Sequence, residues 1–198
     1  MMMIRASKVR VARAALAGAV LFAPTILLPE FSSAGATTVP ICPASALTIG
    51  VGVGGAAAGN LGFPVIITNH GSKACSLDGF AMVTAHTEAV SPHPVTFVHT
   101  SRSQIYTTAK AKPVIVGRNE TASFGVSYVD ALDQQYGEAP RCLMTSIAVR
   151  LPGVAPLSKP TISFTAHGAT YQGTINVCFA GFKFGLTPIV KGSAPPYR

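Results

Sequence analysis

The chain reads Thr68-Asn69-His70-Gly71-Ser72-Lys73-Ala74-Cys75-Ser76-Leu77-Asp78-Gly79-Phe80 directly after the alternating run Leu61–Ile67. Apolar residues at every second position predict a strand in that run, and the Asn-His-Gly-Ser sequence after it is typical of a tight turn. A second strand is expected to begin at Cys75, where a cysteine points to a disulfide. Strand, turn and strand in close succession indicate an antiparallel β-sheet.

Similar short segments recur along the chain. In the clearest one, the even-numbered residues of Ala122–Tyr128 are apolar and the odd-numbered ones are small or polar, which predicts a half-buried strand. Roughly eight or nine such strands, separated by Gly and Pro turns, predict an all-β antiparallel sandwich, with a closed barrel as the alternative. The chain contains no Trp, so the Cys-Trp-Cys core of antibody domains is missing and the fold is Ig-like in architecture alone. Pro64 lacks a backbone donor and therefore predicts an edge strand or a bulge.

The N-terminus predicts export. Arg5, Lys8, Arg10 and Arg13 precede an apolar stretch from Ala14 to Leu28, and small residues follow up to Ala36. This order is that of a secretory signal peptide over residues 1–36, cleaved near Ala36. The alternative is an uncleaved anchor, but the apolar stretch contains Pro24 and is shorter than the roughly 20 residues that span a bilayer. We expect a protein that is secreted or associated with the cell envelope.

The remainder is expected to form one domain over residues 37–192 and a flexible tail over residues 193–198. Removal of 36 residues from 198 leaves 162, which is enough for one hydrophobic core. The signal carries four of the 15 Lys and Arg residues and one of the seven acids, so the formal charge of the remainder is +5 rather than +8. This modest excess is compatible with attraction to anionic envelope polymers or lipids. Without a basic stripe with interleaved aromatic residues, no nucleic-acid partner is expected.

Four cysteines remain, and an oxidising compartment favours disulfides. Three connectivities are possible, and we favour Cys42–Cys75 with Cys142–Cys178. Catalytic or metal-bound thiols fit less well, because the chain has no Cys-x-x-Cys pair.

Taken together, these residues resemble an actinobacterial exported family known as domain of unknown function 4232. Cys42, the turn Thr68–Gly71 with Cys75–Phe80, the segment Val114–Ala122, and Cys178 with Leu186–Val190 correspond to the successive blocks of that family. The resemblance covers about Ile41 to Lys191 and implies a secreted or envelope-attached β-sandwich with two disulfides. It implies no catalytic residues.

The sequence predicts no enzyme. The segment nearest to a nucleophile elbow is Gly125–Val129, and its serine lies in the middle of a predicted strand, where an elbow cannot form. Asp130 and Asp133 are the closest pair of carboxylates, and a solvated turn explains them. We assign no catalytic residue and expect no cofactor.

Two binding hypotheses remain. The first is a binding module for an envelope or extracellular protein, glycan or lipid, which uses loops between Thr84 and Lys112 with Arg102, Lys110 and Lys112 as candidate contacts. In this hypothesis the membrane is contacted only through the signal peptide before cleavage. The alternative is a copper or zinc site formed by His86, His93 and His99, although their spacing matches no ligand motif.

Overall fold

The structure, a computed structural model, describes residues 38–87, 95–129, 143–157, 159, 161–163, 175–177 and 183–197. All of them belong to one compact unit, Thr37–Arg198, which contains the hydrophobic core. Five residues that the sequence analysis singled out lie outside the described residues: His93, Asp130, Asp133, Cys142 and Cys178.

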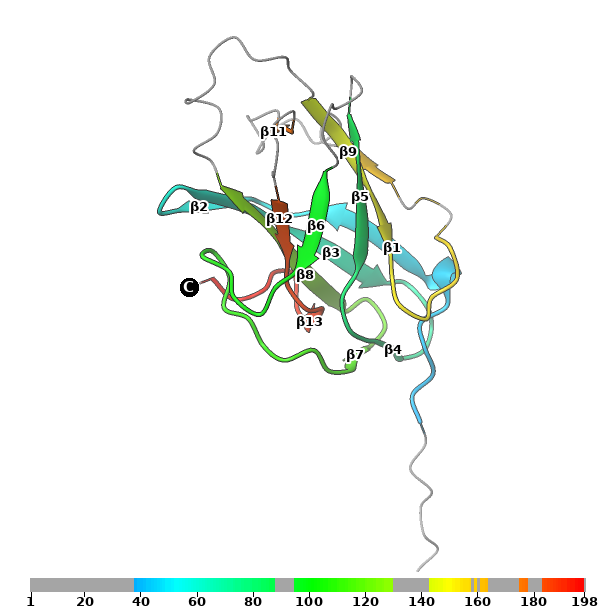
Figure 1. Cartoon of the computed structure of the whole chain (residues 1–198). Helices are drawn as coiled ribbons and strands as arrows, with labels where there is room; N and C mark the ends of the chain where they lie inside the picture. Colours follow the sequence, from blue (N-terminus) through cyan, green and yellow to red (C-terminus); the bar gives the residue numbers. More distant parts are fainter. Residues whose placement is uncertain are drawn as a thin grey trace, which may run out of the picture. The chain divides into compact units, whose positions relative to one another are not determined.

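The larger sheet is built around two long central strands, β3 (Asn60–Asn69) and β8 (Thr121–Val129). Its strand order is β1-β3-β8-β12-β6, with β2 paired to β3 and β13 paired to β8 (Figure 1). Neighbouring strands are antiparallel except β12 and β6, which are parallel. The other members are β1 (Leu47–Val51), β2 (Gly55–Ala57), β6 (Thr96–His99), β12 (Lys183–Leu186) and β13 (Val190–Lys191).

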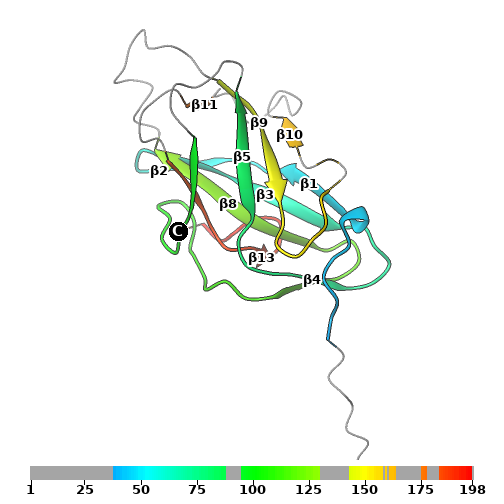
Figure 2. The same ribbon diagram turned by 45° about the vertical axis from the view of Figure 1, so that its right-hand side comes forward.

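A second sheet lies over one face of the first, and its strands cross those of the larger sheet at an angle (Figure 2). It pairs β9 (Leu143–Arg150) with β5 (Met82–Thr87) on one side and with β10 (Thr161–Ser163) and β11 (Ile175–Asn176) on the other. At one end, β4 (Cys75–Leu77) and β7 (Val114–Val116) form a small two-stranded sheet. The described strands close into no barrel, so the all-β prediction is confirmed and the arrangement agrees with a sandwich rather than its alternative.

The core lies between the two larger sheets. Alternate residues of β3 and β8 point into it, as the period of a strand requires, and they meet Ile147 and Val149 of β9. Phe63, Val65, Phe124 and Val126 are fully buried there. The predicted inward face of Ala122–Tyr128 is therefore confirmed.

The opposite face of β8 departs from the prediction. Ser123 and Gly125 are also buried, so the expectation of a half-buried strand is wrong at these positions. The cover comes from residues 101–113, called the strap below, which connect β6 with β7 and place Ile105 and Tyr106 against this face. The sandwich thus carries a partial third layer.

Pro64 lies in the interior of the larger sheet, so the prediction of an edge is wrong. The register on one side of β3 shifts by one residue beside Pro64, from Val51↔Val65 in β1 to Gly55↔Gly62 in β2, which agrees with the alternative of a bulge. Its carbonyl oxygen accepts a hydrogen bond of 2.8 Å from the backbone N–H of Gly52, just beyond the end of β1. The N–H and C=O of a strand residue face the same side. The missing donor of Pro64 therefore faces the break between β1 and β2.

The C-terminal residues, expected as a flexible tail, are docked on the domain. Tyr197 forms an isolated bridge with Tyr106, and its hydroxyl donates to the carbonyl oxygen of Val53 at 3.2 Å. The backbone N–H of Thr107 donates to the carbonyl oxygen of Pro196 at 2.7 Å. The tail therefore lies against the strap and β2.

Candidate functional site

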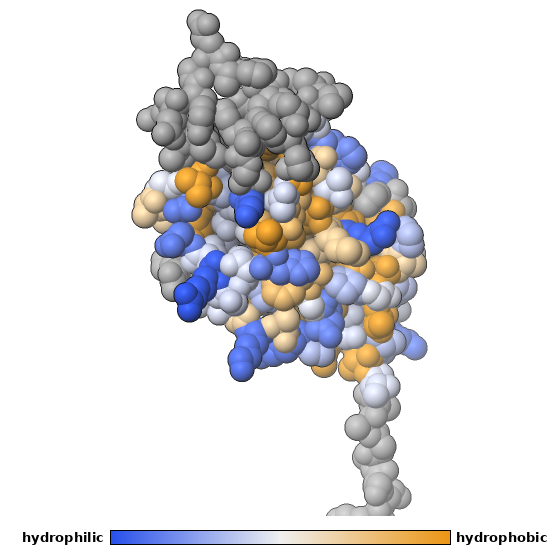
Figure 3. Space-filling model, in the orientation of Figure 1, coloured by the Kyte–Doolittle hydropathy of each residue, from blue (hydrophilic) through white to orange (hydrophobic). Residues whose placement is uncertain are grey.

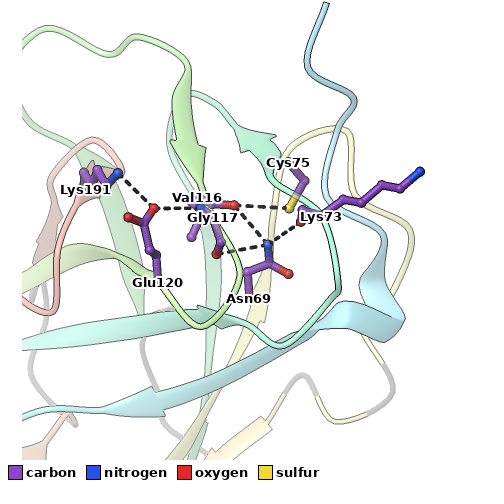
Figure 4. A network of polar contacts seen from close by, with 7 residues as sticks. All are labelled: Asn69, Lys73, Cys75, Val116, Gly117, Glu120 and Lys191. Carbon is purple, nitrogen blue, oxygen red and sulfur yellow. Dashed lines mark hydrogen bonds and ion pairs between the residues drawn. The ribbon is translucent and has the colours of Figure 1, made fainter.

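The buried amide of Asn69 joins two turns at one end of the sandwich (Figure 4). Its Nδ2 donates to three backbone carbonyl oxygens, those of Lys73 at 2.9 Å, Val116 at 2.9 Å and Gly117 at 3.2 Å. Its Oδ1 accepts from the backbone N–H of Gly71 at 2.8 Å. Since both polar atoms of this buried amide are engaged by the backbone, Asn69 has a structural role and is not available to a ligand.

The glycines of the same segment are explained by space and backbone conformation. A Cβ on Gly71 would lie 2.9 Å from Oδ1 of Asn69, closer than real Cβ atoms approach. Gly79 has a φ of 75°, in the left-handed region that favours glycine. The motif that identifies the family is therefore a folding element, and the turn at His70 is no binding site by itself.

The predicted disulfide between Cys42 and Cys75 is present, with Cα atoms 4.7 Å apart. It ties the segment before η1 (Ala44–Ala46) to β4. The pairing of Cys142 with Cys178 lies outside the described residues and stays a prediction.

Glu120 closes the β7–β8 turn. Its Oε2 accepts from the backbone N–H of Gly117 at 2.7 Å and lies 2.9 Å from Nζ of Lys191 on β13. The hydrogen bond from Lys191, followed by the one from Gly117, lowers the pKa of the Glu120 carboxyl below its ordinary value of 4.5. Among the described residues this is the one ion pair, and it sits at the same end as Asn69 (Figure 4).

The structure does not bring the predicted histidines together. His99 stacks on Phe80, with ring centroids 4.4 Å apart, at the beginning of the segment that becomes β5. His86 lies near the other end of β5, on its exposed face, and not in the loop that we expected. Six residues of extended chain separate Phe80 from His86, about 20 Å, so His86 and His99 cannot share one ion. No group of three metal-ligating side chains occurs in the described part of the chain, which does not include His93. The separation of His86 from His99 argues against a site that all three histidines share.

The three candidate cations of the strap are all exposed. Arg102 lies three residues after the end of β6, where its backbone N–H donates to Oγ1 of Thr100, while Lys110 and Lys112 precede β7. Between them the strap is fixed by the fully buried Tyr106. The side chains therefore project from an anchored segment, although they do not form a single cluster.

Over residues 37–198 the formal charge is +5, and four of the six acids, Glu88, Asp130, Asp133 and Glu138, lie outside the described residues. The described surface is cationic. It carries nine exposed Lys and Arg residues and two exposed acids, and one pair of these is neutralised by the Lys191–Glu120 contact. Figure 3 shows that hydrophilic and hydrophobic residues are interspersed on the face that it draws. The cations are Lys73, Arg102, Lys110, Lys112, Arg118, Arg150, Lys159, Lys183 and Lys191, and the acids are Asp78 and Glu120.

A hollow of about 350 Å³ lies on the outer face of the second sheet. Met82 and Thr84 of β5, Ala148 and Arg150 of β9, and the loop at Pro156 line it. Met82 and Arg150 are paired across the two strands and point outward together. The hollow offers an apolar floor with one guanidinium and no carboxylate, which suits a binding surface more than an acid–base site.

The structure places Ser127 in the middle of β8, as expected, with its Oγ 3.4 Å from Oγ of Ser103. No strand-to-helix turn exposes it. Asp130 and Asp133 lie outside the described residues. The prediction that the protein is no enzyme stays a prediction.

The residues that sequence reasoning missed are Tyr106 and Tyr197, which hold the strap and the tail against the larger sheet. Their rings pack at a centroid distance of 5.3 Å although 91 positions separate them in the chain. Neither tyrosine belongs to a periodic segment, so no strand pattern could reveal them. The one signal that the sequence offers is an aromatic residue, Tyr106, within a polar segment.

The fold and the Asn69 network define a class of protein. It is an all-β sandwich in which the turn after β3 is held by Asn69 and followed by a cysteine in a disulfide. The chain belongs to the family described as domain of unknown function DUF4232, whose model matches residues 42–177. No curated protein and no solved structure matches the chain. No helix in the described residues has the length and apolarity needed for a membrane crossing.

Proposed function

We propose that the protein is an exported, non-catalytic binding module that attaches to an anionic component of the cell envelope. Export is supported by the sequence of residues 1–36, which has the order of a signal peptide. The observation that carries the binding role is the formal charge of +5 over residues 37–198, together with a single ion pair among the described residues. Cations left without carboxylate partners attract a polyanion and raise its local concentration.

The strap is the part of this surface best suited to bind. Its cations Arg102, Lys110 and Lys112 are exposed, and its backbone is held by Tyr106 and by the bond from Thr107 to Pro196. An anchored segment loses little conformational freedom when it binds, which favours affinity. Loops on a rigid β scaffold commonly carry recognition for the same reason.

Cosedimentation with washed cell envelopes tests this proposal. The unit Thr37–Arg198 should bind envelopes at low salt and dissociate at high salt, because screening weakens the attraction between exposed charges. The strap variant Arg102→Gln/Lys110→Gln/Lys112→Gln should bind on the order of tenfold or more weakly, given about 1 kcal/mol per basic residue at an anionic surface.

The matched control removes the same charge elsewhere, in Arg150→Gln/Lys159→Gln/Lys183→Gln, and should retain most of the binding. Binding that ignores salt, or that both triple variants reduce equally, would contradict the role of the strap. Turnover of an envelope substrate by the purified unit would contradict the non-catalytic assignment.

A further inference from the structure

Two isoleucines stand in a row on the outer face of the small sheet formed by β4 and β7. Ile41 forms a parallel bridge with Ser76, and Ser76 pairs with Ile115. Residues paired across strands share a face, so the three side chains point the same way, with the isoleucines about 10 Å apart.

Both isoleucines are open to solvent, with 55% of Ile41 and 51% of Ile115 exposed. Their strand neighbours Cys75, Leu77, Val114 and Val116 point inward and are buried. The outward isoleucines are thus not part of the core. We call Ile41, Ser76 and Ile115 the isoleucine surface.

Three exposed cations lie close to this surface along the chain. Lys73 lies three residues before Ser76, while Lys112 and Arg118 lie three residues before and after Ile115, and each is exposed. Figure 4 shows the Lys73 side chain extending away from the Asn69 network. Among the described residues, the acids at this end are Asp78, which is exposed, and Glu120, which is neutralised by Lys191. Positive charge therefore predominates around the isoleucines.

The N-terminal segment joins the domain at the same place. The described chain begins at Thr38, three residues before Ile41, and the disulfide at Cys42 fixes this entry to β4.

We infer that the isoleucine surface, together with Lys73, Lys112 and Arg118, docks onto an anionic lipid surface. Aliphatic side chains enter the boundary between headgroups and acyl chains, and neighbouring Lys and Arg bind anionic headgroups; these two terms add in interfacial binding. This inference rests on the proposed function and specifies its partner, because Lys112 belongs to the strap as well.

Vesicle cosedimentation tests the docking. The unit Thr37–Arg198 should bind vesicles that contain phosphatidylglycerol and should bind pure phosphatidylcholine vesicles at least tenfold more weakly. The variants Ile41→Ser/Ile115→Ser and Lys112→Gln/Arg118→Gln should each lower binding, the latter by about fivefold for every basic residue removed.

Controls come from the other end of the sandwich. Val53, which is 64% exposed, follows β1, and Lys183 begins β12. Val53→Ser and Lys183→Gln should leave vesicle binding unchanged. These positions lie away from the Asn69 end, because β1 begins opposite Asn69 and β12 pairs with the far half of β8.

The outcomes separate the two proposals. Binding to envelopes without binding to phosphatidylglycerol vesicles would overturn the lipid inference and leave the envelope role standing. If the protein bound neither envelopes nor phosphatidylglycerol vesicles, the lipid inference and the envelope role would both be overturned. A dimer in solution that Ile115→Ser dissociates would assign the isoleucine surface to a second copy of the chain and refute lipid docking.

Discussion

The ring of Tyr106 occupies the space in which a side chain at Gly125 would have to lie. A Cβ on Gly125 would be 2.4 Å from Cδ2 of Tyr106, and one on Gly62 of the neighbouring strand would be 3.2 Å from its Cε2. The strap therefore packs on two central strands, β3 and β8, at positions where only glycine leaves room for the Tyr106 ring. Because Tyr106 is fully buried, this contact orders the segment that carries Arg102 and Lys110.

Substitution of Gly125 should loosen the strap. We expect Gly125→Ala to lower the free energy of unfolding by about 1–3 kcal/mol, because the added methyl group collides with a buried ring. Urea unfolding measures it. Gly50→Ala on β1 is the matched control, since nothing lies within 4 Å of a Cβ there. Equal effects of the two substitutions would contradict the close packing at Gly125.

Replacement of Asn69 should destabilise the end of the sandwich. Asn69→Ala leaves three backbone carbonyl oxygens without the amide that they share, and we expect a loss of about 3 kcal/mol in urea unfolding. Asn60→Ala is the control, because its Nδ2 makes one exposed hydrogen bond, to the carbonyl oxygen of Ala58. A loss below about 0.5 kcal/mol for Asn69→Ala, the usual range of surface substitutions, would argue against the structural role.

The Cys42–Cys75 disulfide should contribute strongly to stability. With a sequence separation of 33 residues, the chain-entropy estimate is about 3–4 kcal/mol, and Cys42→Ser/Cys75→Ser should lose that amount. Peptide mapping without reduction should recover a linked Cys42–Cys75 peptide. A peptide that links Cys42 to Cys142 would refute the pairing.

Acid should weaken the β7–β8 turn through Glu120. Since its pKa is lowered in the folded protein by Lys191 and Gly117, the stabilisation is complete above the unfolded pKa of about 4.5 and is lost as the pH falls through the folded pKa. Glu120→Gln should therefore remove part of the loss of stability between pH 5 and pH 2. The effect should be small, because both side chains are about half exposed.

NMR titration provides the direct test of the ion pair. In Lys191→Gln, the pKa of Glu120 should rise toward its ordinary value, since the largest cause of the shift is gone. The remaining bond from Gly117 should keep part of the shift. An unchanged titration of Glu120 in Lys191→Gln would show that the salt bridge does not form in solution.

The sequence predicted the strands that alternate strongly. Leu61–Ile67 and Ala122–Tyr128 fall in β3 and β8, whose inward residues fill the core, because a period of two assigns faces without any knowledge of the partner strand. A similar local cue, a cysteine at the beginning of a strand after a tight turn, indicated a disulfide at Cys75, while its pairing with Cys42 was the favoured one of three connectivities.

Contacts between distant segments could not be predicted. The outer face of β8 was expected to meet solvent, but it is covered by Tyr106 from a loop with no periodic pattern. Likewise, His86 and His99 are close in sequence, yet β5 and β6 run in opposite directions and hold them apart (Figure 1). The spacing of two residues along the chain does not show whether they lie close together when their strands belong to different sheets.

The amino-acid sequence by itself determined the all-β class, the long central strands and the disulfide-bearing turn, because each rests on local periodicity or turn chemistry. Only the tertiary structure decided that the Asn69 amide is hydrogen-bonded to backbone carbonyl oxygens, that Tyr106 anchors the strap, and that Ile41 and Ile115 share one exposed face. Each of these depends on which residues far apart in the chain become neighbours, and that is fixed by the packing of the sheets.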